Sequence, residues 1–99
     1  MPLFATLVVT CVLTAKGAEC DIATHDKYQQ TSLPVCFVKL DRDRFKVAKA
    51  LMERTNTDEL LPGSHNCFQT VAHRDSVLKR VLAQFEKAGI VVNRINLEK

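Results

Sequence analysis

The N-terminal run from Leu3 to Thr14 constrains the fold more than any other stretch, because it carries no charge over twelve residues. With a period of two, its side chains separate into two unequal faces, and six of them are Val or Thr. Alternation with many β-branched residues is typical of a strand. We therefore predict a strand over residues 3–14, which the remainder of the chain must cover.

A cleaved signal peptide is the alternative interpretation of residues 1–17. The apolar run has a suitable length, and Ala15 and Gly17 are the small residues that cleavage after Gly17 would need. No Lys or Arg precedes the run, however, and Val and Thr replace the Leu and Ala of a typical export signal. A membrane span is not expected, because the uncharged stretch ends at Lys16 and is shorter than the ~20 residues that a bilayer requires.

Size and charge describe an ordinary single domain. The chain has 99 residues, of which 46% are hydrophobic and 25% charged, enough for one modest core without metals or disulfides. The net charge of +3 is mild, and acidic residues are interleaved with basic ones in the charged segments 39–54 and 74–99. A phosphate-binding surface usually concentrates Lys and Arg without such interleaving. Nucleic acid is therefore not the expected partner.

The four cysteines, Cys11, Cys20, Cys36 and Cys67, allow two interpretations. In an exported protein, an even number predicts two disulfides with three possible pairings. Cleavage after Gly17 would remove Cys11 and leave an odd number, so the two signs of export conflict. We therefore favour reduced cysteines buried as small apolar residues, which indicates a cytoplasmic protein. A secreted or periplasmic protein is the alternative.

A loop and a second strand are predicted after the first strand. Residues 15–17 are predicted to form a turn, and the polar residues 18–33 a long loop without a clear period, in which a short strand around Asp21–Thr24 is an alternative. Pro34 then precedes the apolar run 35–40, which has the length of a short strand.

Two amphipathic helices are predicted in the second half of the chain. Asp41 or Asp43 caps the first, which ends near Thr55, and Asp75 or Ser76 caps the second. Each helix presents one apolar stripe for burial. The first stripe contains Phe45, Ala48, Leu51 and Met52, and the second contains Val77, Leu78, Val81, Leu82 and Phe85.

One mixed or antiparallel sheet of about four strands follows from this order. Residues 57–63 are predicted to add a short helical turn, 65–72 a third strand and 90–97 the last strand. The order is strand, loop, strand, helix, strand, helix, strand, an α+β class in which both helices pack on one face, since each has only one apolar stripe. This architecture resembles the ferredoxin-like sandwich, which hosts too many unrelated functions to imply one.

No set of residues predicts a metal, a cofactor or a catalytic centre. His65 and Cys67 with Cys20 and His25 could supply four zinc ligands, but they lack the paired spacing typical of zinc sites. Cys67 with His65 or His73 could form a nucleophile and base, but a catalytic thiol needs an electropositive, partly exposed setting. We therefore predict a protein that is not an enzyme and uses no cofactor.

By elimination, the predicted function is binding to another protein, whose identity the sequence does not give. A regulator or inhibitor would use an exposed sheet surface or the loop 18–32. A symmetric homodimer through the sheet is the simplest assembly. The candidate partner surface in that loop consists of Asp21, His25, Tyr28 and Gln29.

Two other functions remain open from the sequence. One is an exported, disulfide-containing protein such as an immunity or defence factor. The other is a weak nucleic-acid-binding protein, whose affinity would fall steeply with added salt. Its candidate basic face consists of Arg42, Arg44, Lys46, Lys49, Lys79 and Arg80.

Overall fold

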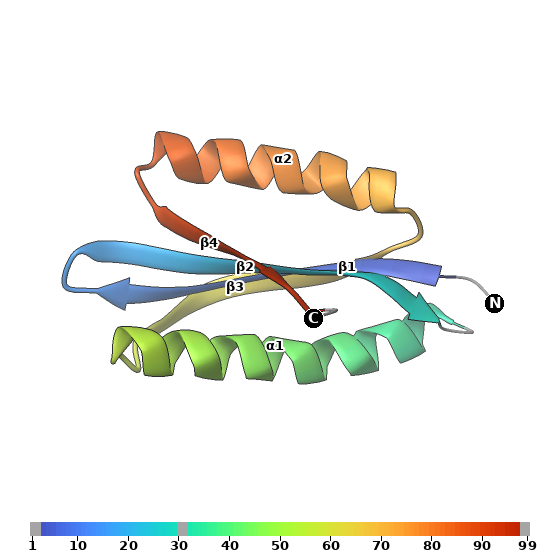
Figure 1. Ribbon diagram of the computed structural model, residues 1–99, viewed down its shortest axis with the longest axis horizontal. Coiled ribbons are helices and arrows are strands. Elements are labelled where there is room, and N and C mark those ends of the chain that lie inside the picture. The colour runs from blue at the N-terminus through green and yellow to red at the C-terminus, as the bar shows by residue number, and fades with distance from the viewer. Residues whose placement is uncertain (1–2, 30–31, 98–99) are drawn as a thin grey trace.

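The structure is a computed structural model that describes residues 3–29 and 32–97 (Figure 1). Its elements are β1 (Leu3–Thr14), β2 (Gly17–Gln29), α1 (Leu33–Thr55), β3 (Leu60–Phe68), α2 (Val71–Lys87) and β4 (Val91–Asn96). The four strands form one sheet in the order β3-β1-β2-β4. β1 is antiparallel to both of its neighbours, whereas β4 is parallel to β2. The predicted α+β class, with one mixed four-stranded sheet and two helices, is confirmed.

β1 is an inner strand of the sheet, and this position explains its lack of charge. The predicted strand over residues 3–14 is confirmed. Phe4 and Val8 are buried on the side of α1, whereas Leu7 and Val9 are buried on the side of α2. A charged side chain on either face would lose its contact with water at a high cost. Both faces of β1 are therefore built from uncharged residues.

The predicted long loop at 18–33 is wrong, because β2 occupies Gly17–Gln29. β1 and β2 form a hairpin in which Thr14 pairs with Gly17 across a two-residue turn. Gly17 has a φ of +111°, a conformation that a side chain would disfavour. β2 looks polar in sequence because one of its buried positions is an acid, Asp21, whose charge is matched by Arg54 of α1.

The predicted strand at 35–40 is also wrong, because these residues form the first turns of α1. The helix begins after Ser32, whose hydroxyl accepts a hydrogen bond from a backbone N–H of the first turn at 3.4 Å. Pro34 is tolerated in this turn, where its missing N–H would have no intrahelical partner. Asp41 and Asp43 lie inside the helix and do not cap it.

α2 also begins earlier than predicted. Residues 57–63 form no helical turn, since β3 starts within them, and β3 ends before the predicted strand at 65–72 would end. The hydroxyl of Thr70 accepts a hydrogen bond from the backbone N–H of the third residue of α2 at 3.1 Å. The predicted caps, Asp75 and Ser76, therefore lie inside the helix.

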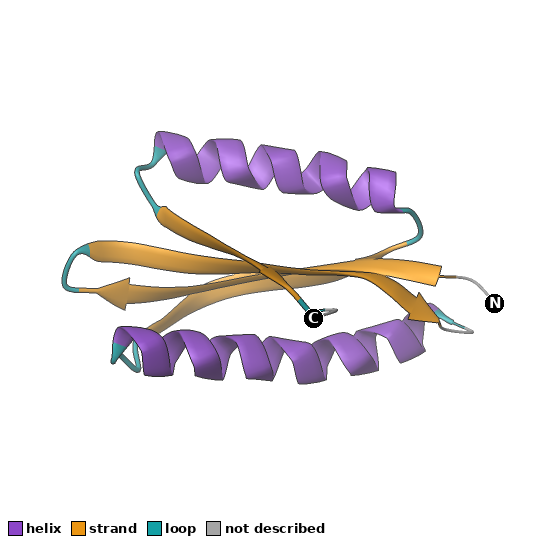
Figure 2. Cartoon of the chain, viewed as in Figure 1, coloured by secondary structure: helices purple, strands orange, loops and turns teal. Residues whose placement is uncertain are grey.

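The two helices lie on opposite faces of the sheet (Figures 1 and 2). The prediction that both pack on one face, as in the ferredoxin-like sandwich, is wrong. α1 connects β2 to β3 across β1, and α2 returns in the opposite direction from β3 to β4 across the whole sheet. Both connections join parallel strands, and such crossovers are nearly always right-handed. Two right-handed crossovers in opposite directions must place their helices on opposite faces.

Each face of the sheet has its own hydrophobic core. The core beneath α1 consists of Phe4, Val8, Ala23, Cys36, Leu40, Val47 and Cys67. The core beneath α2 consists of Leu7, Val9, Cys11, Cys20, Ile22, Phe68 and Leu78. The sheet thus separates two small cores, each completed by one helix.

All four cysteines are paired, so the prediction of reduced cysteines is wrong. Cys11 and Cys20 occupy paired positions of the β1–β2 hairpin and are bonded to each other. Cys36 of α1 is bonded to Cys67 of β3, with their Cα atoms 6.4 Å apart. One disulfide therefore lies within the sheet, and the other attaches α1 to the sheet.

Candidate functional site

The residues of the predicted partner surface do not form an exposed loop. They lie in β2, which is paired with a strand on each side. Asp21 is fully buried, and His25 is partly buried. Tyr28 and Gln29 belong to the same strand, but their side chains lie outside the described part of the structure. In the described part of the chain, residues 18–29 therefore form a strand and not a loop, and a helix packs on each face of the sheet.

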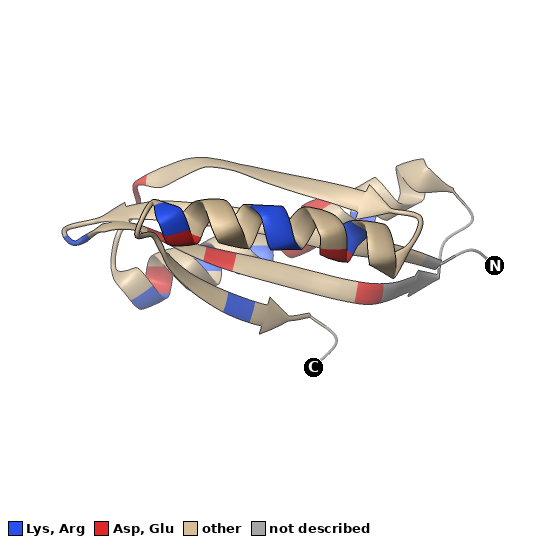
Figure 3. Ribbon diagram, turned by 90° about the horizontal axis from the view of Figure 1, so that it is seen from above, with Lys and Arg blue, Asp and Glu red and all other residues tan. Residues whose placement is uncertain are grey.

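The six residues of the predicted basic face do not share one surface. Arg44 belongs to α1, partly buried and 3.3 Å from the carboxylate of Asp41. Lys79 and Arg80 belong to α2, on the other side of the sheet, where basic and acidic residues alternate along the helix (Figure 3). The exposed basic residues of α1 are Lys39, Arg42, Lys46, Lys49 and Arg54. The predicted basic face is therefore divided between α1 and α2, which lie on opposite sides of the sheet.

Disulfide formation removes the cysteine-based sites that the sequence suggested. The sulfurs of Cys20 and Cys67 are each bonded to another sulfur, so neither is a thiolate for a metal or a nucleophile. Within residues 3–29 and 32–97, no three His, Cys, Asp or Glu side chains are grouped to hold a metal ion. Neither helix of these segments combines the length and the apolar character that crossing a membrane requires.

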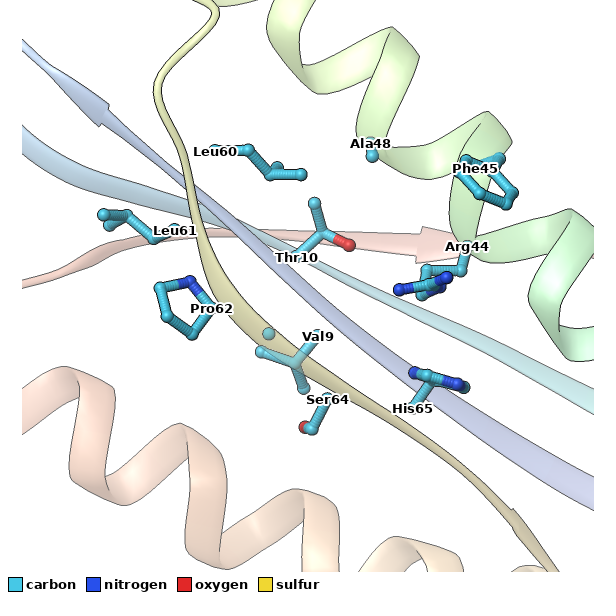
Figure 4. Close-up of a pocket in the computed structure, with 11 residues that line it drawn as sticks. Val9, Thr10, Arg44, Phe45, Ala48, Leu60, Leu61, Pro62, Ser64 and His65 are labelled. Carbon is cyan, nitrogen blue, oxygen red and sulfur yellow. The ribbon is translucent and has the colours of Figure 1, made fainter.

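A pocket of about 250 Å³ lies between α1 and the edge strand β3 (Figure 4). Its floor is formed by Val9 and Thr10 of β1. Phe45 of α1 and Leu60 of β3 line it and are 67% and 51% exposed. The pocket is therefore bordered by large apolar side chains that are left in contact with water. Its other lining residues are Arg44, Ala48, Leu61, Pro62, Gly63, Ser64 and His65.

An ionic cluster borders the same pocket. The carboxylate of Asp41 lies 3.3 Å from the guanidinium of Arg44 and 3.6 Å from the imidazole of His65. The guanidinium of Arg44 in turn lies 5.0 Å from the ring centroid of Phe45, within the range of a cation–π contact. An apolar wall beside a few fixed polar groups is the usual composition of a binding site.

A bulge in β3 shapes this part of the sheet. Val9 pairs with Ser64 and Cys11 pairs with Leu61, so two steps along β1 correspond to three along β3. The extra residue is accommodated around Gly63, where an added Cβ would lie 2.3 Å from the carbonyl oxygen of Val9. Only glycine fits this close approach of two backbones.

The same bulge borders a second pocket on the opposite face of the sheet. This pocket of about 530 Å³ lies between β3 and α2 and includes Val81 and Phe85. Pro62, Gly63 and Ser64 line both pockets. β3 is at the edge of the sheet and has one neighbouring strand. The first half of β3 therefore borders a pocket on each face of the sheet.

Arg54, which the sequence analysis did not single out, ties the end of α1 to the sheet. Its guanidinium lies 2.6 Å from the carboxylate of Asp21 and 3.5 Å from that of Glu19. The hydrogen bond to Asp21 raises the pKa of Arg54, and burial lowers it in part. Asn93 of β4 donates hydrogen bonds to both acids, at 3.1 and 3.0 Å. The buried acid of β2 is thus held from two neighbouring elements.

Arg74 makes a corresponding contact between α2 and the sheet. Here the arginine is buried and its acidic partners are in contact with water. Arg74 is 3% exposed and donates hydrogen bonds to the carbonyl oxygen of Thr6 at 3.0 Å and to Asp75 at 2.8 Å. It also pairs with Asp26 of β2. Burial by itself would lower the pKa of Arg74, but the hydrogen bonds to Asp26 and Asp75 raise it. Both arginines hold elements together and lie outside the two pockets.

Asp43 is an acid whose charge is disfavoured. Burial raises the pKa of the Asp43 carboxyl, and His25 and Lys46 lower it in part. Among the described residues, one of its carboxylate oxygens is buried and has no hydrogen-bond partner. Asp43 lines neither of the two pockets beside β3.

Phe45 is the site residue that the sequence analysis misassigned. It belonged to the stripe predicted for burial, yet it is 67% exposed. The buried side of α1 is Cys36, Leu40, Val47, Ala48 and Leu51. A helix extended back to Leu33 brings Cys36 and Leu40 into the helical period, and this longer pattern is the signal that could have corrected the assignment.

The described surface offers two pockets and exposed apolar side chains around the first half of β3. These features suit binding to another molecule. No protein-family model matches the sequence, and no curated protein or solved structure is significantly similar to the chain.

Proposed function

We propose that this chain is a small, non-enzymatic protein that acts by binding another protein, as a regulator or inhibitor. The binding surface is formed where α1 meets the edge strand β3. The observation that supports it is the exposure of Phe45 and Leu60, 67% and 51%, beside a pocket of about 250 Å³. Exposed apolar patches beside polar groups are typical of interaction sites, and aromatic side chains often dominate their energy.

The two disulfides support an oxidising compartment for this function. Disulfides persist in secreted and periplasmic proteins and are rare in the reducing cytoplasm. The pairing of Cys11 with Cys20 also uses the first strand, so export of this fold requires that β1 be retained. We therefore favour a secreted or periplasmic protein, with an immunity or defence factor as one form of it, over a cytoplasmic one.

Mass spectrometry of the protein from its native source tests the compartment. Alkylation without reduction should modify no cysteine, and the intact mass should be lower than the reduced mass by the four hydrogens that two disulfides remove. Four alkylated cysteines in the untreated protein would contradict an oxidising compartment.

Site-specific photo-crosslinking tests the binding surface. A photoreactive phenylalanine analogue replaces Phe45 in one variant and Arg80 in a matched control, since both positions are exposed and lie on opposite sides of the sheet. The variant at position 45 should form a defined protein adduct in the native source, and Leu60→Asp should reduce its yield at least threefold. Equal adducts from both positions, or none, would contradict the proposed surface.

A further inference from the structure

We propose that the partner at this surface is a second copy of the same chain, and that the two copies meet through antiparallel α1 helices. This inference rests on the proposed protein-binding surface and names its occupant. The contact uses one side of α1, here called the outer flank. The outer flank consists of Val38, Asp41, Phe45, Lys49 and Met52.

The apolar residues of the outer flank form a regular stripe. Val38, Phe45 and Met52 recur every seven residues, which is close to two helical turns and keeps them on one side of the helix. Val38 and Phe45 are each 67% exposed, and Met52 is partly exposed. A coiled-coil seam has two apolar positions in each heptad, and this stripe supplies one of them, so it suits a narrow helix–helix contact flanked by charges.

The outer flank lies beside the edge of the sheet, where its Asp41 is 3.6 Å from the imidazole of His65 in β3. Phe45 lines the pocket together with Leu60, so this side of α1 lies over β3 (Figure 4). β3 is one of the two edge strands of the described sheet, with β1 as its neighbouring strand. A second molecule can therefore approach the flank from beyond the sheet edge without displacing any described element.

The outer flank is complementary to itself only in an antiparallel pair. When a two-fold axis passes through Phe45, each residue that precedes Phe45 by a given number of positions faces the residue of the second copy that follows Phe45 by the same number. Asp41 then faces Lys49 of the second copy, and Val38 faces Met52. Both contacts occur twice, and the two Phe45 rings meet at the axis. A parallel pair would instead place Asp41 against Asp41 and Lys49 against Lys49, which repel.

Pairing between two β3 edges is the weaker alternative. Pro62 has no backbone N–H to donate, and the bulge around Gly63 interrupts the regular pairing of the strand. Proline and bulges are the devices by which edge strands avoid pairing with other chains. The first half of β3 is therefore poorly suited to continue the sheet into a second molecule.

An anionic lipid surface is also the weaker occupant. Lys39, Arg42, Lys46 and Lys49 are exposed on α1 and would favour it, but Asp41 lies within the outer flank itself, and Glu53 is exposed one helical turn from Lys49. Helices that bind membrane surfaces usually have a polar face dominated by Lys and Arg. The neutral charge pattern of the flank matches a copy of itself better.

Sedimentation velocity of the oxidised full chain tests the dimer. The helical contact from Val38 to Met52 is about 21 Å long, so we expect a dissociation constant on the order of 10–100 μM, typical of a small interface. The mass should rise from 11.1 kDa toward twice that value as concentration increases. Phe45→Asp should weaken association at least tenfold, whereas Lys79→Asp on α2 should leave it unchanged. Circular dichroism checks that both variants remain folded.

A charge exchange tests the antiparallel register. Asp41→Lys and Lys49→Asp should each weaken self-association about tenfold, because each creates repulsion across the axis. An equimolar mixture of the two variants should associate again. In the mixed pair, the lysines at positions 41 and 49 of the first variant face the aspartates at positions 49 and 41 of the second. Misfolding cannot explain recovery on mixing.

A chain that stays monomeric at 1 mM, or a mixture that associates no better than its components, would overturn the dimer. Binding of the monomer to phosphatidylglycerol vesicles through Phe45 would assign the flank to a membrane and would also overturn it. If the crosslink at position 45 captures a different protein while the purified chain is monomeric, the dimer fails and the proposed protein-binding function stands.

Discussion

The two helices are attached to the two faces of the same sheet by different means. α1 is bonded to β3 through Cys36 and Cys67, and its Arg54 reaches an acid, Asp21, that is buried in the sheet. α2 contains no cysteine, and its own Arg74 is buried while its acidic partners are partly exposed. The buried charge therefore belongs to the sheet on one face and to the helix on the other.

This difference shows why two similar ion pairs need not contribute equally to stability. Removing Arg54 leaves the buried carboxylate of Asp21 without its cation, and an uncompensated buried charge is costly. Removing Arg74 removes the buried charge itself and leaves acids that water can reach. The position of the buried partner, more than the distance between the charges, decides the cost.

Loss of the disulfide between α1 and the sheet should lower the stability of the chain more than loss of the hairpin disulfide, of either arginine or of a helix cap. Cys36→Ala with Cys67→Ala should lower the free energy of unfolding by about 3.5 kcal/mol, because the bond closes a long loop in the unfolded chain. The hairpin disulfide closes a shorter loop, so Cys11→Ala with Cys20→Ala should cost about 2.5 kcal/mol. Urea unfolding of both variants measures the difference. A larger loss of stability from removing the hairpin disulfide would contradict the greater contribution expected of the disulfide that attaches α1.

Exchanging the arginines for methionine should give the next largest effect. Arg54→Met should cost about 3 kcal/mol and Arg74→Met about 1–2 kcal/mol, mainly from the lost hydrogen bonds. Adding Asp21→Asn to Arg54→Met should recover most of the loss, since the buried charge is then gone. Thermal unfolding at pH 7 measures all three variants. Equal costs without recovery would show that burial does not govern these pairs.

Removing a helix cap should lower the free energy of unfolding less than exchanging an arginine. The loss should be greater for the cap of α2 than for the cap of α1. Thr70→Ala should cost about 1 kcal/mol, a typical value for a capping residue. Ser32→Ala should cost less, because its hydrogen bond is longer, 3.4 Å against 3.1 Å, and Cys36 fixes the first turn of α1 covalently. Urea unfolding of the two variants measures which cap contributes more to stability. The comparison fails if the cap of α1 proves the more costly to remove.

Asp43→Asn should have the smallest effect and the opposite sign. Burial raises the pKa of Asp43 in the folded chain, so the folded state binds the proton more tightly than the unfolded state. Stability linked to this group is therefore present at acid pH and is lost as pH rises from the ordinary value of 3.8 through the raised pKa. The variant should be more stable at pH 7 by about 0.5 kcal/mol, and the gain should vanish near pH 3.

Thermal unfolding from pH 3 to pH 7 measures the effect of Asp43→Asn. The surface substitution Asp58→Asn is the matched control, since Asp58 is exposed. A gain that does not depend on pH would exclude the buried carboxylate as its cause.

The sequence predicted the elements whose pattern is complete within one segment. β1 and the stripe of α2 that contains Leu78 are examples, and β4 at Val91–Asn96 lies within the strand predicted at 90–97. Their hydrophobic periods need no information from elsewhere in the chain. The class and the order of elements agree with the structure, although the second strand was predicted at 35–40 and is found at Gly17–Gln29.

The elements that were missed depend on partners far along the chain. β2 includes Asp21, whose burial makes sense only beside Arg54, 33 residues later. The run 35–40 has the length of a strand, and only its continuation beyond Leu40 shows that it belongs to a helix. Ser32 and Pro34 were the local signs of the helix start. Once β2 is known, counting back from the turn also brings Cys20 opposite Cys11.

The candidate site could not be predicted because it arises from the topology. The pocket joins Phe45 of α1 to Leu60 of β3 across a bulge in the sheet. Neither residue carries a motif, and the exposure of Phe45 depends on which side of α1 faces the core. The choice of sheet face for each helix follows from the strand order, which the sequence does not state.

The pairing of β4 with β2 has a consequence for chains that fold while they are being made or exported. Residues 19–24 find their parallel partners at 91–96, which leave a ribosome or a translocation channel after the other three strands of the sheet. Until then β2 has one open side, and the apolar underside of α2 is only partly covered. A chain arrested before β4 would offer both to chaperones and to neighbouring nascent chains, so the release of β4 acts as the step that closes this sheet.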